Sequence, residues 1–137
     1  MSATDELRAA AVKLRRLAKD ATPGPWRDSS VDGLNRYAAL VSDTKPEGRS
    51  PDGGWDDIEG YGGYLIGESL GGKDRAYIAT VNPVLALALA DLLDAHADDF
   101  DWDEEESDNC CGPDDVCWEC ARNKAVLEVA RAINGAS

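Results

Sequence analysis

The chain has 137 residues and a formal net charge of −13 at pH 7, which is enough length for a single domain, 1–137, with a modest core. A chain this negative is not expected to bind DNA, RNA or an anionic membrane through broad electrostatics. The N-terminal segment is amphipathic rather than a signal peptide, and the apolar run 84–90 is too short to span a bilayer. We therefore expect a soluble, cytoplasmic protein.

The first predicted element is an amphipathic helix with Thr4 as its N-cap, followed by Asp5 and Glu6 at its positive end. Its apolar side chains recur at three- and four-residue spacing and are expected to face the core: Leu7, Ala10, Ala11, Leu14, Leu17 and Ala18. The segment 22–26, Thr-Pro-Gly-Pro-Trp, cannot continue a helix and predicts a rigid turn. We expect this turn to direct Trp26 into the space between the helix and the next element.

Two short β-strands are predicted next, at 36–41 and 64–66. The Gly-rich connection between them, 42–63, is long for a compact domain, and we interpret it either as a binding loop or as a connection without fixed structure. Residues 67–74 nearly match the phosphate-binding loop G-x-x-x-x-G-K-[ST]. Asp74 replaces the hydroxyl of that motif and would repel a phosphate, so we predict a glycine turn with Asp74 as a helix N-cap.

The longest apolar segment is predicted to form two helices, 74–81 and 83–96, separated at Asn82 and Pro83. Asn is a good N-cap, Pro fits a first helical turn, and the residue before Pro is displaced from the helical region. No polar residue occurs from Val84 to Ala90, so we expect this central helix to be covered on all sides.

An acidic loop, 97–109, is predicted between the central helix and a last helix at 116–134. From Asp94 to Asp115 there are eleven Asp or Glu and no Lys or Arg. Acidic residues alternating with aromatic ones suit docking onto a basic surface of a partner protein, in the manner of a nucleic-acid mimic. The residues expected to bind the partner are Phe100, Trp102, Asp103, Glu104, Glu105 and Glu106. The other interpretation is a solvated loop whose aromatic side chains fold onto the domain.

Four cysteines lie close to the predicted start of the last helix, whose expected apolar stripe is Ala125, Val126, Val129, Ala130 and Ile133. A C-x-x-C pair at a loop-to-helix step lets two thiolates bind one ion, and a structural zinc would then join the two C-terminal helices. The predicted ligands are His96, Cys110, Cys117 and Cys120, with Cys111 as the substitute for Cys110. Disulfides, unpaired core thiols and a redox centre are the alternatives.

Two stretches together resemble the Ead-like early proteins of temperate bacteriophages, including small proteins of actinobacteriophages. The matching residues are Thr22 to Trp26, followed by Asp74, Tyr77, Ile78, Ala79, Asn82 and Pro83. The resemblance covers about half of the chain and leaves out the Gly-rich loop, the acidic run and the cysteines. It implies a phage-encoded accessory protein of the host cytoplasm, and it provides no functional residues.

We predict an α+β fold with an N-terminal helix and a small antiparallel sheet or hairpin that carries the long Gly-rich loop. A C-terminal helical hairpin closed by the cysteine cluster completes it. With one histidine and no nucleophile–base pair, we expect no catalysis, and the predicted function is binding of a host protein. The alternative is a module that binds a nucleotide-like molecule through Trp55, Tyr61, Tyr64, Lys73 and Arg75.

Overall fold

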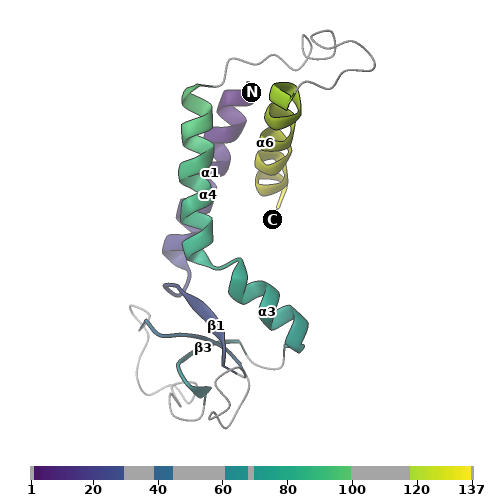
Figure 1. Ribbon diagram of the computed structural model, residues 1–137. Helices are drawn as coiled ribbons and strands as arrows, with labels where there is room; N and C mark the ends of the chain where they lie inside the picture. Colours follow the sequence, from purple (N-terminus) through teal and green to yellow (C-terminus); the bar gives the residue numbers. More distant parts are fainter. Residues whose placement is uncertain (1, 30–38, 45–60, 68–69, 100–117, 137) are drawn as a thin grey trace. The chain divides into compact units, whose positions relative to one another are not determined.

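The computed structural model describes residues 2–29, 39–44, 61–67, 70–99 and 118–136. They form an α+β fold, which confirms the predicted class (Figure 1). The elements in chain order are α1 (Ala3–Asp20), β1 (Trp26–Asp28), β2 (Leu40–Ser42), β3 (Tyr64–Gly67), α3 (Gly72–Thr80), α4 (Pro83–Asp98) and α6 (Trp118–Gly135). Two compact units divide the chain: a helical unit, Met1–Arg15 with Ala88–Ser137, and a sheet unit, Arg16–Leu87. Within the described ranges no single helix is long and apolar enough to cross a membrane, although the bent pair α3 and α4 passes the same test together.

The helical unit is built on α1, α4 and α6, which lie side by side in Figure 1. Its core combines three leucines with five alanines, and the small side chains let the helices approach closely. The buried residues are Leu7, Ala10, Ala11, Ala90, Leu93, Ala97, Leu127 and Ala130. Burial of each leucine contributes roughly 1.5–3 kcal/mol. Hydrophobic packing between helices that are distant in sequence therefore holds this unit together.

The cap of α1 differs from the prediction, because Ser2 rather than Thr4 stands at the helix start. The Ser2 hydroxyl accepts a hydrogen bond from the Asp5 N–H, at 3.2 Å, while the Asp5 carboxylate accepts bonds from the N–H and hydroxyl of Ser2. This reciprocal pair satisfies two backbone donors of the first turn. The hydrogen bonds from Ser2 lower the pKa of Asp5 below its ordinary value.

The inward face of α6 is also shifted from the predicted stripe. Leu127 and Ala130 are buried, and Val126 and Ile133 pack against the core, whereas Ala125 and Val129 are exposed. The far end of α6 is tied to α1, since Lys13 donates to the carbonyls of Ile133, Asn134 and Ala136. A cation at this position suits the negative end of a helix.

The sheet unit contains a three-stranded antiparallel sheet in the order β1-β2-β3. Trp26 pairs with Ser42 across β1 and β2, and Ser42 pairs with Tyr64 across β2 and β3. The central strand β2 is buried throughout. The prediction of a strand at 64–66 is confirmed. The strand predicted at 36–41 is described only from residue 39. The observed strand β2 begins at Leu40 and ends at Ser42, one residue after the predicted end.

Ser29 and Ser42, the buried serines among the described residues of the sheet unit, both form hydrogen bonds. The Ser29 hydroxyl accepts a hydrogen bond from the Ala39 N–H at 2.9 Å, and the Ser42 hydroxyl donates to the Pro23 carbonyl at 2.5 Å. The second bond fastens the turn after α1 to the sheet. Trp26 begins β1, and its indole N–H donates to the Thr22 carbonyl at 2.8 Å.

The predicted break between the two middle helices is confirmed. Asn82 caps α4 as expected, because its side-chain oxygen accepts a hydrogen bond from the Val84 N–H at 2.8 Å. At the start of α3, however, the prediction of Asp74 as the N-cap is wrong. Gly71 occupies that position without a side-chain hydrogen bond, and Asp74 lies in the first turn of the helix.

Candidate binding surfaces

Two of the four predicted zinc ligands, His96 and Cys120, belong to the described residues, whereas Cys110, Cys111 and Cys117 lie outside them. His96 is half-buried near the end of α4, and Cys120 lies in the first turn of α6. In the described ranges no three His, Cys, Asp or Glu side chains are close enough to hold a metal ion. The zinc site, and with it the cysteine-closed hairpin, stays a prediction.

The acidic loop falls outside the described residues from Phe100 onward, so Phe100, Trp102 and the carboxylates at 103–106 are not placed. The acidic residues that precede it are partly neutralised within the helical unit. Arg8 of α1 pairs with Asp98 at 3.2 Å, and Arg15 pairs with Asp91 at 2.8 Å and with Asp94. Hydrogen bonds to Asp91 and Asp94 raise the pKa of Arg15. Asp98, which lies within the predicted acidic loop 97–109, therefore belongs to α4 and is paired with Arg8.

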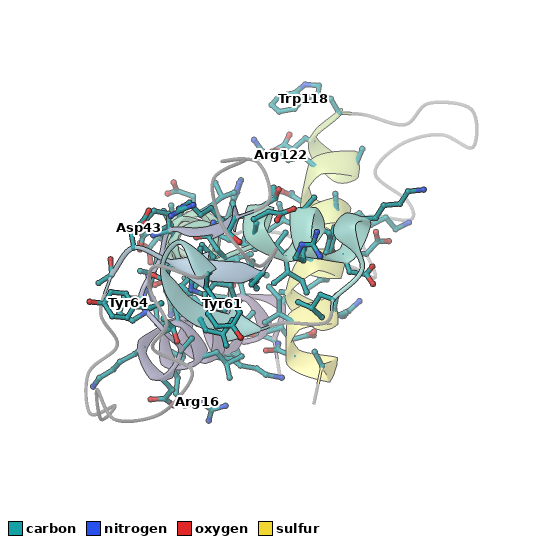
Figure 2. The ribbon with its side chains drawn as sticks, turned by 90° about the horizontal axis from the view of Figure 1, so that it is seen from below. Arg16, Asp43, Tyr61, Tyr64, Trp118 and Arg122 are labelled. Carbon is teal, nitrogen blue, oxygen red and sulfur yellow. The ribbon has the colours of Figure 1, made fainter. Side chains whose placement is uncertain are left out.

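Four of the five predicted nucleotide-binding residues, Tyr61, Tyr64, Lys73 and Arg75, belong to the described part of the chain. Tyr61 and Tyr64 are half-buried, and Figure 2 shows that their rings do not stack on each other. The Arg75 guanidinium lies 3.1 Å from the Asp28 carboxylate of β1, and it also donates to the Leu70 carbonyl at 2.6 Å. An arginine already bound to a half-buried carboxylate is a poor anion receptor. Lys73 is exposed, and Trp55 lies outside the described residues.

The prediction that the central helix is covered on all sides is wrong. In α4, Pro83 and Ala90 are buried, but Val84, Leu85 and Leu87 are 52%, 45% and 46% exposed. The helix buries one face only, and its other face is apolar as well. A segment without polar residues carries no information on which side is covered, and this is the reason for the error.

The end of α3 extends this exposed apolar surface. Tyr77 and Val81 are 69% and 44% exposed, and no residue of α3 is buried. We define the apolar corner as Tyr77, Val81, Val84, Leu85 and Leu87, all in the sheet unit. These five are half of the ten exposed large apolar side chains in the described part of the chain, and they fall within eleven consecutive residues. Such concentration is typical of an interaction surface.

The turn after α1 packs directly against the apolar corner. A Cβ atom on Gly24 would lie 2.9 Å from Cγ2 of Val84 and 3.1 Å from the side-chain oxygen of Asn82. A glycine is therefore needed for this close approach. Beside the contact is an open cavity of about 460 Å³, whose lining includes Thr22, Pro83 and Leu87. The two stretches that carry the phage resemblance meet at this point of the fold.

A second cavity, of about 470 Å³, lies within the helical unit between the end of α4 and the start of α6. We call it the α4–α6 groove. It is lined by Leu92, Ala95, His96, Asp99, Glu119, Arg122 and Asn123. Of the two described zinc-ligand candidates, His96 lines the groove and Cys120 does not. His96 thus faces carboxylate and amide groups from the start of α6.

The sequence analysis missed Tyr77, Val81 and Asn123 as candidate binding residues. Tyr77 and Val81, the C-cap residue of α3, are four residues apart, and this helical spacing was the available signal. A buried asparagine gives no such signal, because only the packing of α6 shows that its amide is enclosed. No family model matches the chain, and neither does any curated protein or solved structure.

Proposed function

We propose that this protein is a non-enzymatic, phage-encoded accessory protein that binds a host protein through the apolar corner. The observation that supports the proposal is the exposure of five large apolar side chains at the α3–α4 junction. Water contact with a surface of this kind is unfavourable, and a partner that covers it gains hydrophobic free energy. Tyr77 is a suitable anchor because tyrosine is enriched at the energetic centres of interfaces.

The partner's expected chemistry follows from the charge of the chain. A net charge of −13 attracts a partner with a basic surface, and the apolar corner requires that the partner also has an apolar patch. The acidic residues at 103–106, with Phe100 and Trp102, are proposed to contribute to this attraction. Phage origin is supported by the resemblance of the 22–26 turn and of the Asn82 and Pro83 step, which contact each other through Gly24.

The test is capture of the partner from a lysate of the bacterial host, with the purified full chain as bait. The double variant Tyr77→Ser/Leu85→Ser should lose capture, because both side chains leave the apolar corner. The matched control is Val12→Ser/Leu17→Ser, which removes two exposed apolar side chains of α1. Circular dichroism checks that both variants stay folded. Equal capture by the corner variant and the wild type would contradict the proposal.

The acidic loop is tested separately in the same experiment. Replacing the four carboxylates at 103–106 by serine should weaken capture at low salt and have less effect at high salt, because ionic screening already removes that contribution. Capture that is unchanged at both salt concentrations would show that the loop is not part of the interface.

A structural zinc is proposed at the start of α6. Cys120 lies in the first turn of α6, and Cys117 precedes it by three residues in the sequence. The positive end of a helix stabilises thiolates at these positions. Native mass spectrometry should find one zinc per chain. A metal-free chain whose mass is lower by two hydrogens for each cysteine pair would show that the cysteines form disulfides and do not bind zinc.

A further inference from the structure

The α4–α6 groove contains a buried polar side chain to which the described part of the chain gives no hydrogen-bond partner. Asn123 is 8% exposed, and it lines the cavity together with side chains from the end of α4. Throughout the described ranges its side-chain amide makes no hydrogen bond. A buried amide costs free energy unless it is hydrogen-bonded, and in native proteins a protein group, an ordered water or a bound ligand satisfies it. The groove therefore offers a donor and an acceptor to a ligand.

Two carboxylates at the groove are also uncompensated. Asp99, directly after α4, and Glu119, in the first turn of α6, line it from opposite sides, and neither forms an ion pair within the part of the chain that the structure describes. The other carboxylates near the end of α4 differ, because Asp94 and Asp98 pair with arginines of α1. The positive end of α6 offsets the charge of Glu119 only in part. Both carboxylates are exposed, so a cationic ligand can reach them.

The one cation of the groove is directed elsewhere. The Arg122 guanidinium carbon lies 5.0 Å from the ring centroid of Trp118, and Figure 2 shows the two side chains together at the start of α6. A cation–π contact holds the guanidinium over the indole. Arg122 therefore borders the groove without neutralising Asp99 or Glu119.

We propose that the α4–α6 groove binds a lysine or arginine side chain of a protein partner. Leu92 and Ala95 provide an apolar wall for the aliphatic stem. Asp99 and Glu119 bind the terminal charge, and the carbonyl oxygen of Asn123 accepts one of its hydrogen bonds. An anionic ligand is disfavoured by both carboxylates and by the helical unit as a whole, which has sixteen Asp or Glu against six Lys or Arg. This site lies in the helical unit and does not depend on the apolar corner.

The test is an NMR titration of the full-length, isotope-labelled protein. The probes are capped pentapeptides of alanine with a central arginine or lysine, and the control peptide has norleucine at the centre. The basic peptides should produce saturable shifts of the Asn123 side-chain amide and of the Leu92 and Ala95 methyl groups. The norleucine peptide should leave these signals in place.

Variants locate the effect in the groove. The Asp99→Asn/Glu119→Gln double variant should raise the dissociation constant of the arginine peptide about five-fold or more. The matched control, Glu128→Gln, removes an exposed charge from α6 outside the groove and should leave the constant unchanged.

Equal binding by the double variant, or equal shifts with norleucine, would overturn the proposal. Shifts with spermidine but not with the peptides would also overturn it, because the ligand would then be a free polyamine. Partner capture that is lost in the corner variant but kept in the groove variant would leave the proposed function intact.

Discussion

The helical unit and the sheet unit differ in how they distribute charge and apolar surface. The helical unit has sixteen acidic against six basic residues, and the sheet unit has eleven against eight. The helical unit buries Leu7, Leu93 and Leu127 between three helices, whereas the sheet unit leaves Tyr77, Val84, Leu85 and Leu87 exposed. Strong charge in one unit and exposed apolar surface in the other indicate two kinds of recognition. The first is electrostatic, and the second is hydrophobic.

The largest expected effect is on the core of the helical unit. Leu127→Ala removes a fully enclosed side chain and should lower the free energy of unfolding by about 2–5 kcal/mol. Val129→Ala, on the exposed side of the same helix, should change it by less than about 0.5 kcal/mol. Urea denaturation followed by circular dichroism measures both. Similar losses for the two variants would contradict the assignment of the inward face of α6.

The second largest expected effect is the loss of stability when an ion pair is broken, and it should differ between the two units. In the sheet unit, Asp28 and Arg75 have side chains 14% and 15% exposed, so Asp28→Asn leaves a largely enclosed guanidinium and should cost about 2–3 kcal/mol. In the helical unit, Asp98 and Arg8 are 74% and 54% exposed, so Asp98→Asn should cost less than about 1 kcal/mol. Urea denaturation compares the two variants. A larger loss for Asp98→Asn would reverse this ranking.

Gly24→Ala tests the contact beneath the apolar corner. The added methyl group would lie 2.9 Å from Cγ2 of Val84, and the overpacking should cost about 1–2 kcal/mol. Removing the obstructing methyl groups in Gly24→Ala/Val84→Ala should recover part of that loss. Thermal denaturation of the single and double variants gives the coupling. Strictly additive effects would show that the two residues do not touch.

The smallest effect concerns the first turn of α1. The pKa of Asp5 is lower in the folded chain than its ordinary 3.8, so the charged form stabilises the fold. That stabilisation is complete above the unfolded pKa and is lost as the pH falls through the folded pKa. Asp5→Asn should therefore destabilise the protein at pH 6, and its difference from the wild type should shrink below pH 3.8. A difference that does not change between pH 6 and pH 2.5 would rule out the Ser2 contact as its cause.

Local chemistry predicted much of the helical framework. The Asn82 and Pro83 step fixed the boundary between α3 and α4, because a cap and a proline act within one turn. The strand at Tyr64–Gly67 followed from its apolar composition. The strand Trp26–Asp28 was missed, since three residues are too few to show an alternating pattern.

The candidate sites depend on contacts between residues that are distant in the sequence, and a local sequence pattern does not predict such contacts. Asp28 and Arg75 are 47 residues apart, and nothing in either segment indicates that they pair. In α4 the sequence is apolar on every face, so it predicts a helix but not the side that remains exposed. Asn123 became a candidate only once the packing of α6 placed its amide beside Asp99 and Glu119.

The central claim is that the apolar corner is a binding surface, and site-specific photo-crosslinking tests it most directly. A photoreactive amino acid is placed at Leu85 in one variant and at Val12, a more exposed position on α1, in another. The account predicts that, in host cells, position 85 crosslinks to one defined protein and position 12 does not. Crosslinks to the same protein at equal yield from both positions, or only to a second copy of this chain, would contradict it.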